Sequence, residues 1–391
     1  MHILYVNSYL SREDTEQGTW GRKFVEELRN TGVEVTTVPR YDESDGRHPR
    51  LTSGFFRISS LKEDLPGWLV HLLIEPRMVI RGLSYTVALW FQARRSARSN
   101  MPDVVYARVG YWDWAPWLIG RSLKRPVVME VHGLNYLERT FRGQRRSRLL
   151  RAFELVQLRR AACLRVCSKS LIRLLEEEGV DSHRIRFIPL GVEVMPRTKS
   201  ELQVPADPVK IVFAGSFYQW HGTEVLLHAF ALLRRSLPNA RLELMGDGLT
   251  RMDNERLSKE LSIDDSVEFA GWLPRRVMLE RVQASDIAVA PFLTLYYFDP
   301  AKLLDYMSAG VAIVASRLDR AVDILKDGRG GVLVPAGDTE ALAAALTELS
   351  GDPDRRAMLG TAAQEILQQE GYCSDKVVGR LVSLFAELSS E

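Results

Sequence analysis

Short apolar runs alternate with longer amphipathic segments along most of the chain. The first run, MHILYVN at 1–7, has the unbroken hydrophobicity of a strand that is buried on both faces. The segment 22–32 then repeats its apolar positions with a helical period, and VEVTTV at 33–38 returns to a strand pattern. Further strands of the first half are predicted at 103–109, 126–133, 164–168 and 184–193, with another helix at 169–179.

The same alternation restarts after residue 208. Six strands are predicted at 210–215, 241–248, 267–273, 286–291, 311–316 and 331–334, and helices are predicted between the earlier ones at 223–236, 249–262 and 277–285. Two successive βα arrays predict an α/β fold with two doubly wound, Rossmann-like parallel sheets. Ligands of such sheets bind at the carboxyl ends of the strands, so the cleft between the two domains is the expected site.

Length and composition agree with this division. The 391 residues exceed what a single hydrophobic core usually organises. Hydrophobic residues make up 46% and charged residues 26%, which is typical of a globular protein rather than a disordered one. The polar, proline-interrupted stretch 193–208 is typical of a linker. We therefore expect an N-terminal domain at 1–192 and a C-terminal domain at 209–372, with a last helix at 373–391 that packs back on the first domain.

Several features favour a protein of the reducing cytosol. Three cysteines are too few and too unevenly spaced for a disulfide framework or a closed zinc site. The opening segment has no basic start and runs into polar sequence, unlike a secretory signal. The most apolar region, 65–92, is interrupted by Glu75, Pro76 and Arg77, so no uncharged run reaches the roughly 20 residues that cross a bilayer.

Charge is divided unequally between the two halves. Residues 1–200 carry 33 Lys and Arg against 22 Asp and Glu, which gives +11, and the remainder carries 19 against 28, which gives −9. The densest basic cluster, 138–160, includes Arg142, Arg145, Arg146 and Arg148. These arginines fit either a solvated helix face or contact with an anionic membrane surface. Nucleic acid is not expected, because no recognisable binding module accompanies the charge.

The stretch DPAKLLDYMSAGVAIVAS at 299–316 predicts a short helix followed by a buried strand. Asp299 suits the N-cap, Pro300 the first helical position and Gly310 the residue after the helix end. A helix N-terminus presents unpaired N–H groups and a partial positive charge, which suit a phosphate. Asp305 lies roughly 8 Å farther along, at about 1.5 Å per residue. That separation fits a diphosphate followed by a ribose.

In both halves the order of these marks resembles the nucleotide-sugar glycosyltransferases of family 4, also called group 1. The marks of the second half are AGSFYQWHG, LELMGDG, VEFAGWLP, ASDIAVAP and LLDYMSAGVAIVAS. In the first half, IPLGVE resembles the family's strand into the linker, and EVHGLNYLER stands at the place of its cleft histidine. The resemblance covers nearly the whole chain. It implies the GT-B fold, with acceptor binding in the N-terminal domain and nucleotide-sugar binding in the C-terminal one.

Three positions depart from the family pattern. Ser216 and His221 stand where the family usually carries an Arg and a Lys that hold the donor diphosphate, so this clamp is expected to be weaker. The paired glutamates of the family fall on Tyr297 and Asp305, and only Asp305 keeps a carboxylate for the ribose. Lys302, near the start of the helix, is expected to restore the missing positive charge.

The resemblance implies a set of functional residues at matching positions. His132, Lys302 and Asp305 are the candidate catalytic residues, with His132 placing the acceptor. Asp247 fits turn chemistry as well as nucleotide contact, and Gly18 and Gly21 are expected in a loop where the backbone approaches the donor phosphates. The candidate donor-binding residues are Gly18, Gly21, Gly215, Ser216, His221, Gly246, Asp247, Phe269, Tyr297, Asp299, Ala301 and Leu303.

The function implied is transfer of a hexosyl unit from a UDP- or GDP-linked sugar to a glycan or lipid-linked acceptor, with retention of configuration. The family needs no metal, and no other cofactor is implied. We expect a cytoplasmic protein, peripheral on the inner face of the membrane, in polysaccharide biosynthesis. Two alternatives remain: a GT-B scaffold that binds nucleotide or partner without transfer, and an enzyme acting on a soluble natural product. A nicotinamide oxidoreductase is disfavoured because no G-x-G-x-x-G follows the first strand.

Overall fold

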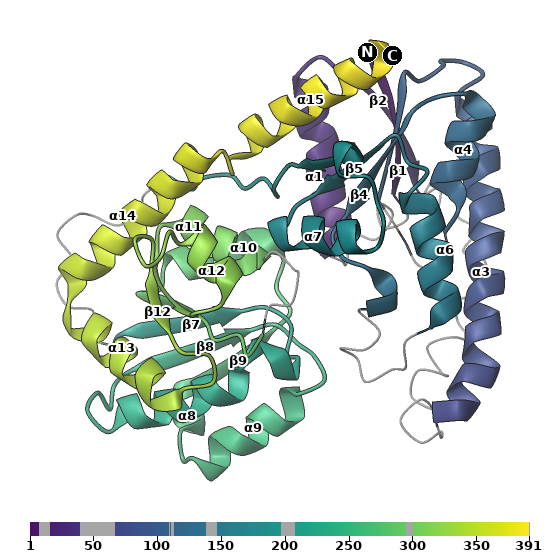
Figure 1. Cartoon of the computed structure of the whole chain (residues 1–391). Coiled ribbons are helices and arrows are strands. Elements are labelled where there is room, and N and C mark those ends of the chain that lie inside the picture. The colour runs from purple at the N-terminus through teal and green to yellow at the C-terminus, as the bar shows by residue number, and fades with distance from the viewer. Residues whose placement is uncertain are drawn as a thin grey trace. The chain divides into compact units, whose positions relative to one another are not determined.

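A computed structural model describes residues 1–7, 16–39, 67–108, 110, 113–137, 147–196, 208–294 and 300–390. The chain divides into two compact units. Unit 1 comprises Met1–Pro189 with Val378–Glu391, and unit 2 comprises Leu190–Val377. Each unit contains one six-stranded parallel sheet with helices on its faces (Figure 1), which confirms the predicted α/β class with two doubly wound sheets.

The sheet of unit 1 has the order β2-β1-β3-β4-β5-β6. Every residue of β1 is buried, because a parallel sheet is covered on both faces. The rings of Phe24 and Phe385 lie 5.5 and 5.2 Å from that of Tyr106, so helices α1 and α15 cover the same face. The strands are β1 (His2–Asn7), β2 (Glu34–Pro39), β3 (Val104–Arg108), β4 (Val127–Val131), β5 (Cys163–Val166) and β6 (Ile185–Phe187).

Two helices of unit 1, Lys169–Glu177 and Ser374–Ser390, lie where the sequence predicts them, whereas the first begins earlier than predicted. Helix α1 already begins at Glu16, so Gly18 and Gly21 lie inside it, and the expected glycine loop at these positions is wrong. Glycine costs about 1 kcal/mol in a helix, and here the surrounding segment outweighs that preference. The α-helices are α1 (Glu16–Asn30), α3 (Gly67–Ser96), α4 (Ala115–Leu123), α6 (Arg148–Leu158), α7 (Lys169–Glu177) and α15 (Ser374–Ser390), whose first residues belong to unit 2; a 3₁₀ turn covers Ser182–Arg184.

The sheet of unit 2 has the order β12-β11-β10-β7-β8-β9. From β7 the chain first adds β8 and β9 on one side of the strand and then adds β10 to β12 on its other side. The strand order therefore reverses between β7 and β10. Ligands of doubly wound sheets bind at this kind of switch point. The strands are β7 (Lys210–Ala214), β8 (Arg241–Met245), β9 (Val267–Gly271), β10 (Ile287–Ala290), β11 (Ala312–Ser316) and β12 (Val332–Val334).

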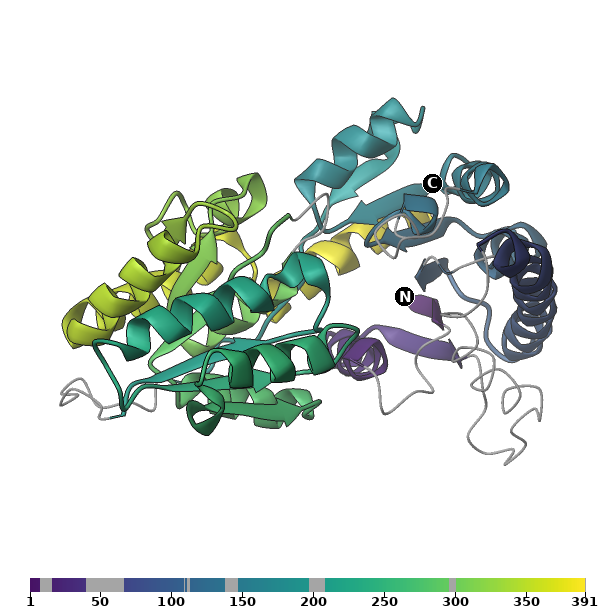
Figure 2. The same ribbon diagram turned by 90° about the horizontal axis from the view of Figure 1, so that it is seen from below.

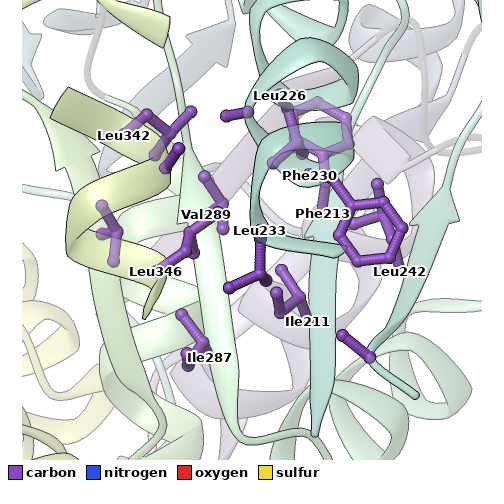
Figure 3. Close-up of a cluster of buried hydrophobic side chains, with 14 of the residues drawn as sticks. Ile211, Phe213, Leu226, Phe230, Leu233, Leu242, Ile287, Val289, Leu342 and Leu346 are labelled. Carbon is purple, nitrogen blue, oxygen red and sulfur yellow. The ribbon is translucent and has the colours of Figure 1, made fainter. Parts of the chain in front are cut away.

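Helices cover both faces of this second sheet. On one face, Leu226 and Phe230 of α8 and Leu342 of α13 pack against Ile211 of β7 and Val289 of β10 (Figure 3). Helix α10 connects β9 to β10, α11 connects β10 to β11, and α12 connects β11 to β12. Helix α14 packs on α11. The α-helices are α8 (Thr223–Arg234), α9 (Arg251–Glu260), α10 (Arg275–Gln283), α11 (Ala301–Ala309), α12 (Asp319–Ile324), α13 (Thr339–Gly351) and α14 (Pro353–Glu370); 3₁₀ turns cover Gln219–His221 and Asp264–Ser266.

The ends of α11 follow the sequence signals closely. Gly310 ends the helix in the left-handed conformation at φ 67°, and its N–H donates to the carbonyl of Met307. Pro300 is the N-cap rather than the first helical residue, and Asp299 lies outside the described residues. Of the predicted linker 193–208, residues 193–196 and 208 are described, and the Met195 N–H donates to the carbonyl of Ser308 in unit 2.

Candidate functional site

A cluster of predicted residues gathers at the switch point of unit 2. The loop after β7 and the beginning of α11 supply it, and the end of β10 closes it on one side. Tyr306 fixes α11 at this place: its buried hydroxyl accepts from the Ala214 N–H at 2.7 Å. The same hydroxyl lies 3.4 Å from the carbonyl oxygen of Val289, so one side chain joins α11 to the ends of β7 and β10. The carboxyl edge of the sheet therefore presents the N-terminus of α11.

Glycines bring the loops after β7 and β8 into backbone contact. Gly215, Gly246 and Gly248 adopt φ values of 148°, 139° and 157°, which L side chains rarely adopt. A Cβ on Gly246 would lie 2.0 Å from the carbonyl oxygen of Gly215, and one on Gly248 would lie 2.5 Å from that of Phe217. Predicted donor-binding positions Gly215 and Gly246 thus lie together, in a loop pair that only glycine permits.

Lys302 reaches from α11 to this loop. A Cβ on Gly215 would lie 2.5 Å from the Lys302 Nζ, so the glycine leaves room for the ammonium group. The same Nζ lies 3.8 Å from the ring centroid of Phe213 and 4.8 Å from that of Phe292. Both distances are within the range of cation–π attraction, which helps to position the ammonium. Lys302 thereby brings a positive charge beside the Gly215 loop.

His221 differs from the expected partly charged side chain. Burial, followed by the positive charge of Lys302, lowers the pKa of His221 to about 3, although its hydrogen bond to Ser216 acts in the opposite direction. Its Nδ1–H donates to the carbonyl oxygen of Ser216, which places the lone pair of the neutral ring on Nε2. At neutral pH the imidazole therefore closes the loop 216–221 and contributes no net charge to it.

Asp305 is buried and forms an ion pair. Its side chain is 6% exposed, and the Arg275 guanidinium, at the start of α10, donates to its Oδ1. A carboxylate has about four acceptor positions, so one guanidinium contact does not exhaust it. The prediction that Asp305 binds the ribose did not include Arg275, because Arg275 and Asp305 are 30 positions apart in the sequence. Asp305 therefore has a structural partner that any role in ribose binding must accommodate.

The other predicted donor-binding positions in unit 2 have mostly local contacts. The Asp247 Oδ1 accepts from the Gly248 N–H at 2.7 Å, which favours turn chemistry. Leu303 is buried, and its N–H donates to the carbonyl of Pro300 at 2.8 Å. Phe269 is half-buried on β9, Ala301 is half-buried at the start of α11, and Ser216 is exposed. Tyr297 and Asp299 lie outside the residues that the structure describes.

In unit 1, His132 directly follows β4 and is held from both sides of its ring. Its Nε2 lies 2.5 Å from the Glu130 Oε1, and its Nδ1 lies 3.5 Å from the Cys167 Sγ. Burial and then the charge of Arg108 lower the pKa of His132 to about 4, although Glu130 acts to raise it. The ring is therefore neutral at pH 7, with Nε2–H donating to the carboxylate.

Glu130 is the centre of a buried polar network under His132. Burial alone raises the pKa of Glu130, but Arg165 and then His132 lower it well below its ordinary value. The Arg165 Nη1 lies 2.6 Å from Oε1, and the Tyr106 hydroxyl donates to Oε2 at 2.9 Å. Arg165 also donates to the carbonyl of Pro189 at 2.6 Å. The predicted acceptor-side histidine is thus oriented by strands β3, β4 and β5 together.

The predicted basic cluster is only partly described. Arg148, the first residue of α6, is exposed, and Arg142, Arg145 and Arg146 lie outside the described residues. Among the residues that are described, no group of three or more His, Cys, Asp or Glu side chains could hold a metal ion. Over the same part of the chain, no helix is long and apolar enough to cross a membrane.

Comparison with known families gives two matches that together span most of both units. A family described as Glycosyltransferase Family 4 matches residues 18–195, and one described as Glycosyl transferases group 1 matches residues 208–352. The chain is 29% identical over 196 residues to the D-inositol 3-phosphate glycosyltransferase of Corynebacterium kroppenstedtii, a match that covers 48% of this chain and 43% of that protein. The chain spans about half the length of the curated relatives that it matches first.

Two further proteins extend the comparison. The lipopolysaccharide core biosynthesis glycosyltransferase LpsE of Rhizobium meliloti is 28% identical over 171 residues, which cover 43% of this chain and 47% of that protein. The structure of HepE from Anabaena, in complex with UDP and glucose, superimposes with a TM-score of 0.72 at 15% identity over 99% of this chain and all of that one. At this identity the superposition shows a shared fold.

Proposed function

Because the chain belongs to the group 1 glycosyltransferases of family 4, we propose that it transfers a hexosyl unit from a nucleotide diphosphate sugar to an acceptor hydroxyl with retention of configuration. The observation that carries the proposal is the meeting of the Gly215 loop, the α11 N-terminus and Lys302 at the switch point of unit 2. Helix N–H groups and an ammonium beside a glycine loop suit a diphosphate.

The diphosphate lies, in this proposal, against the start of α11 and beside Lys302. Its charge grows as the bond between the anomeric carbon and the leaving oxygen breaks. Preorganised N–H groups and the Lys302 ammonium stabilise that charge where it develops. A diphosphate oxygen accepts the proton of the acceptor hydroxyl as the new glycosidic bond forms on the same face, so the configuration is retained. No metal or other cofactor takes part in this scheme.

Asp305 accepts hydrogen bonds from the ribose hydroxyls in the same scheme. Its contact with Arg275 fixes the carboxylate in one orientation before the donor arrives. A fixed and charged acceptor loses little freedom when it binds, which favours affinity. Arg275 is therefore a positioning residue for Asp305 in this proposal.

The acceptor is proposed to be a lipid-linked sugar or an envelope glycan, bound by unit 1 near His132. LpsE, which is named for lipopolysaccharide core biosynthesis, supports this class of acceptor. His132 is neutral and oriented by Glu130, so it is placed to contact the acceptor through its ring edge or through the loop that follows it. The positive balance of residues 1–200 supports a cytoplasmic protein that binds an anionic membrane surface.

Thermal shift measurements with UDP, GDP and ADP test the donor half of the proposal. A ligand at 100 times its dissociation constant adds about 2.7 kcal/mol to the free energy of unfolding, so a binding nucleotide should raise the melting temperature clearly. Loss of the shift in Lys302→Ala would assign the effect to the proposed site. If none of the three nucleotides changes the melting temperature, the donor proposal is wrong.

The neutral state of His221 favours a second candidate, a GT-B scaffold that binds nucleotide without transfer. The diphosphate clamp expected in the family then lacks a charge at both Ser216 and His221. Release of nucleoside diphosphate from UDP-glucose or GDP-mannose, in the presence of extracted envelope glycans, separates the two candidates. Release above the level of Lys302→Ala supports transfer. Nucleotide binding without any release supports the scaffold.

A further inference from the structure

The outer face of α3 exposes large apolar side chains in a helical repeat. Ile80, Leu83, Val87 and Phe91 are 67, 47, 50 and 62% exposed. Their spacings of three, four and four residues place them in one stripe along the helix. In both ribbon views α3 lies at the outer margin of unit 1 (Figure 2). We call this stripe, together with the arginines described below, the α3 outer face.

On the opposite face of α3 the described buried residues are small, except for Leu89. This buried face packs on α4 and β2, and the Thr86 hydroxyl accepts from the Trp114 N–H at 3.0 Å. A helix at the surface of a globular protein usually turns its large apolar residues inward and its polar residues outward. In α3 the large apolar side chains of Ile80, Leu83, Val87 and Phe91 are exposed instead. The buried residues are Gly82, Thr86, Leu89, Ala93 and Ala97.

Beyond Glu75, the charge of this helix is of one sign. No Asp or Glu occurs between 76 and 102, whereas five arginines do. Arg94, Arg95 and Arg98 are exposed at the C-terminal end of the stripe. The Arg94 guanidinium lies 5.1 Å from the centroid of the Trp90 ring, and that ring lies 4.8 Å from the ring of Phe91. Aromatic rings, an apolar stripe and arginines therefore lie within the span 80–98, about five helical turns.

We propose that the α3 outer face docks on a bilayer that contains anionic lipid. From Ile80 to Arg98 the stripe is roughly 27 Å long at about 1.5 Å per residue, so the helix would lie in the plane of the interface. Apolar side chains enter the boundary between headgroups and acyl chains, and the arginines contact lipid phosphates. The helix is not apolar enough to cross the bilayer, which agrees with a surface position.

Charge complementarity distinguishes this occupant from a second copy of the chain. Pairing two α3 outer faces would bring arginines together along a stretch, 76–102, that contains no acid to oppose them. Like charges that face each other across a helix pair are destabilising. An anionic lipid surface supplies the missing negative charge.

This inference extends the membrane part of the proposed function and assigns it to α3 rather than to the 138–160 arginines. It does not require the transfer reaction, because binding to lipid is measured without donor or acceptor. Failure of lipid binding would leave nucleotide binding by unit 2 unaffected, and the reverse also holds. If α3 binds lipid and unit 2 binds nucleotide, unit 1 would contact a lipid-linked acceptor at the membrane surface.

Flotation with phosphatidylcholine vesicles, with and without phosphatidylglycerol, tests the proposal. The wild type should float only with the anionic vesicles and less as salt rises. Two variants divide the contributions: Val87→Ser with Phe91→Ser removes apolar area, and Arg94→Gln with Arg95→Gln and Arg98→Gln removes charge. Each variant should weaken vesicle binding by about tenfold or more. For the arginine variant this follows because each basic residue near the surface contributes on the order of a fivefold gain in affinity.

The matched control replaces apolar residues of similar exposure in unit 2. Leu249 and Met252 are 72 and 82% exposed, so Leu249→Ser with Met252→Ser removes comparable area away from α3. Melting temperatures of all variants establish that they fold. Wild-type binding that is absent, or equal for neutral and anionic vesicles, overturns the proposal. So does an equal loss in the control, or a wild-type dimer in sedimentation that the α3 variants convert to monomer.

Discussion

Substitution of Lys302 should separate diphosphate recognition from support of the fold. The Lys302 ammonium lies beside Gly215 and against the rings of Phe213 and Phe292. Lys302→Ala removes the charge and the aliphatic stem together. Lys302→Met keeps most of the stem in contact with the rings and removes only the charge. The pair of variants therefore isolates the ammonium.

The size of the effect follows from the contacts. A hydrogen bond to a charged group contributes about 1.5 to 3 kcal/mol, so losing one between Lys302 and the diphosphate should weaken binding by roughly 10- to 150-fold. The cation–π contacts with Phe213 and Phe292 are intramolecular and each contributes about 0.5 to 2 kcal/mol. Their loss should lower the melting temperature in both variants, and the loss of packing should lower it further in Lys302→Ala.

Isothermal titration with a nucleoside diphosphate and with the matching nucleoside provides the assay. We expect Lys302→Met to lose most of its affinity for the diphosphate and to keep its affinity for the nucleoside, because the nucleoside carries no phosphate. Lys302→Arg should retain part of the diphosphate affinity. Equal losses for nucleoside and diphosphate would refute the reasoning and assign Lys302 to the fold alone.

Three further predictions concern the groups around the two candidate sites. Asp305→Asn should lower the free energy of unfolding by about 3 kcal/mol because it removes the charged partner of the largely buried Arg275 guanidinium, and a double variant with Arg275→Met should recover stability in urea unfolding; additive losses of the two single variants would contradict a coupled ion pair. Tyr306→Phe should cost about 1 to 3 kcal/mol by leaving the Ala214 N–H without its acceptor, whereas an unchanged urea midpoint would show that the hydroxyl does not fix α11. The folded pKa of His132, about 4, is below its ordinary value of 6.5, so the unfolded chain binds the proton more tightly and stability should fall as pH is lowered from 6.5 towards 4; His132→Gln should flatten that part of the profile, and an unchanged profile would count against the buried neutral ring.

The sheets and their order along the chain could be predicted because buried parallel strands leave continuous apolar runs. Strand β1, for example, is apolar over almost its whole length and buried throughout. Gly310 was predictable for a similar reason, since the residue after a helix often needs a positive φ. These signals are local, so a single sequence contains them.

The contacts that complete the site were not predictable in the same way. Arg275 and Asp305 meet only because α10 and α11 pack side by side, and nothing near either residue indicates the other. The pKa of His221 depends on its burial and on Lys302, which lies 81 positions away. Gly18 and Gly21 show the converse: glycine suggested a loop, and the amphipathic segment around them forms a helix instead. Tertiary contacts decide the first two cases, and the amphipathic segment decides the third.

Hydrogen exchange with and without UDP, GDP and ADP tests the central claim most directly, because it locates a bound nucleotide as well as detecting it. At least one of them should slow amide exchange in the loop 215–222 and at the start of α11, 301–305, in the wild type and much less in Lys302→Met. Protection confined to unit 1, or none with any of the three nucleotides at saturating concentration, would contradict a diphosphate site at the β7–β10 switch point.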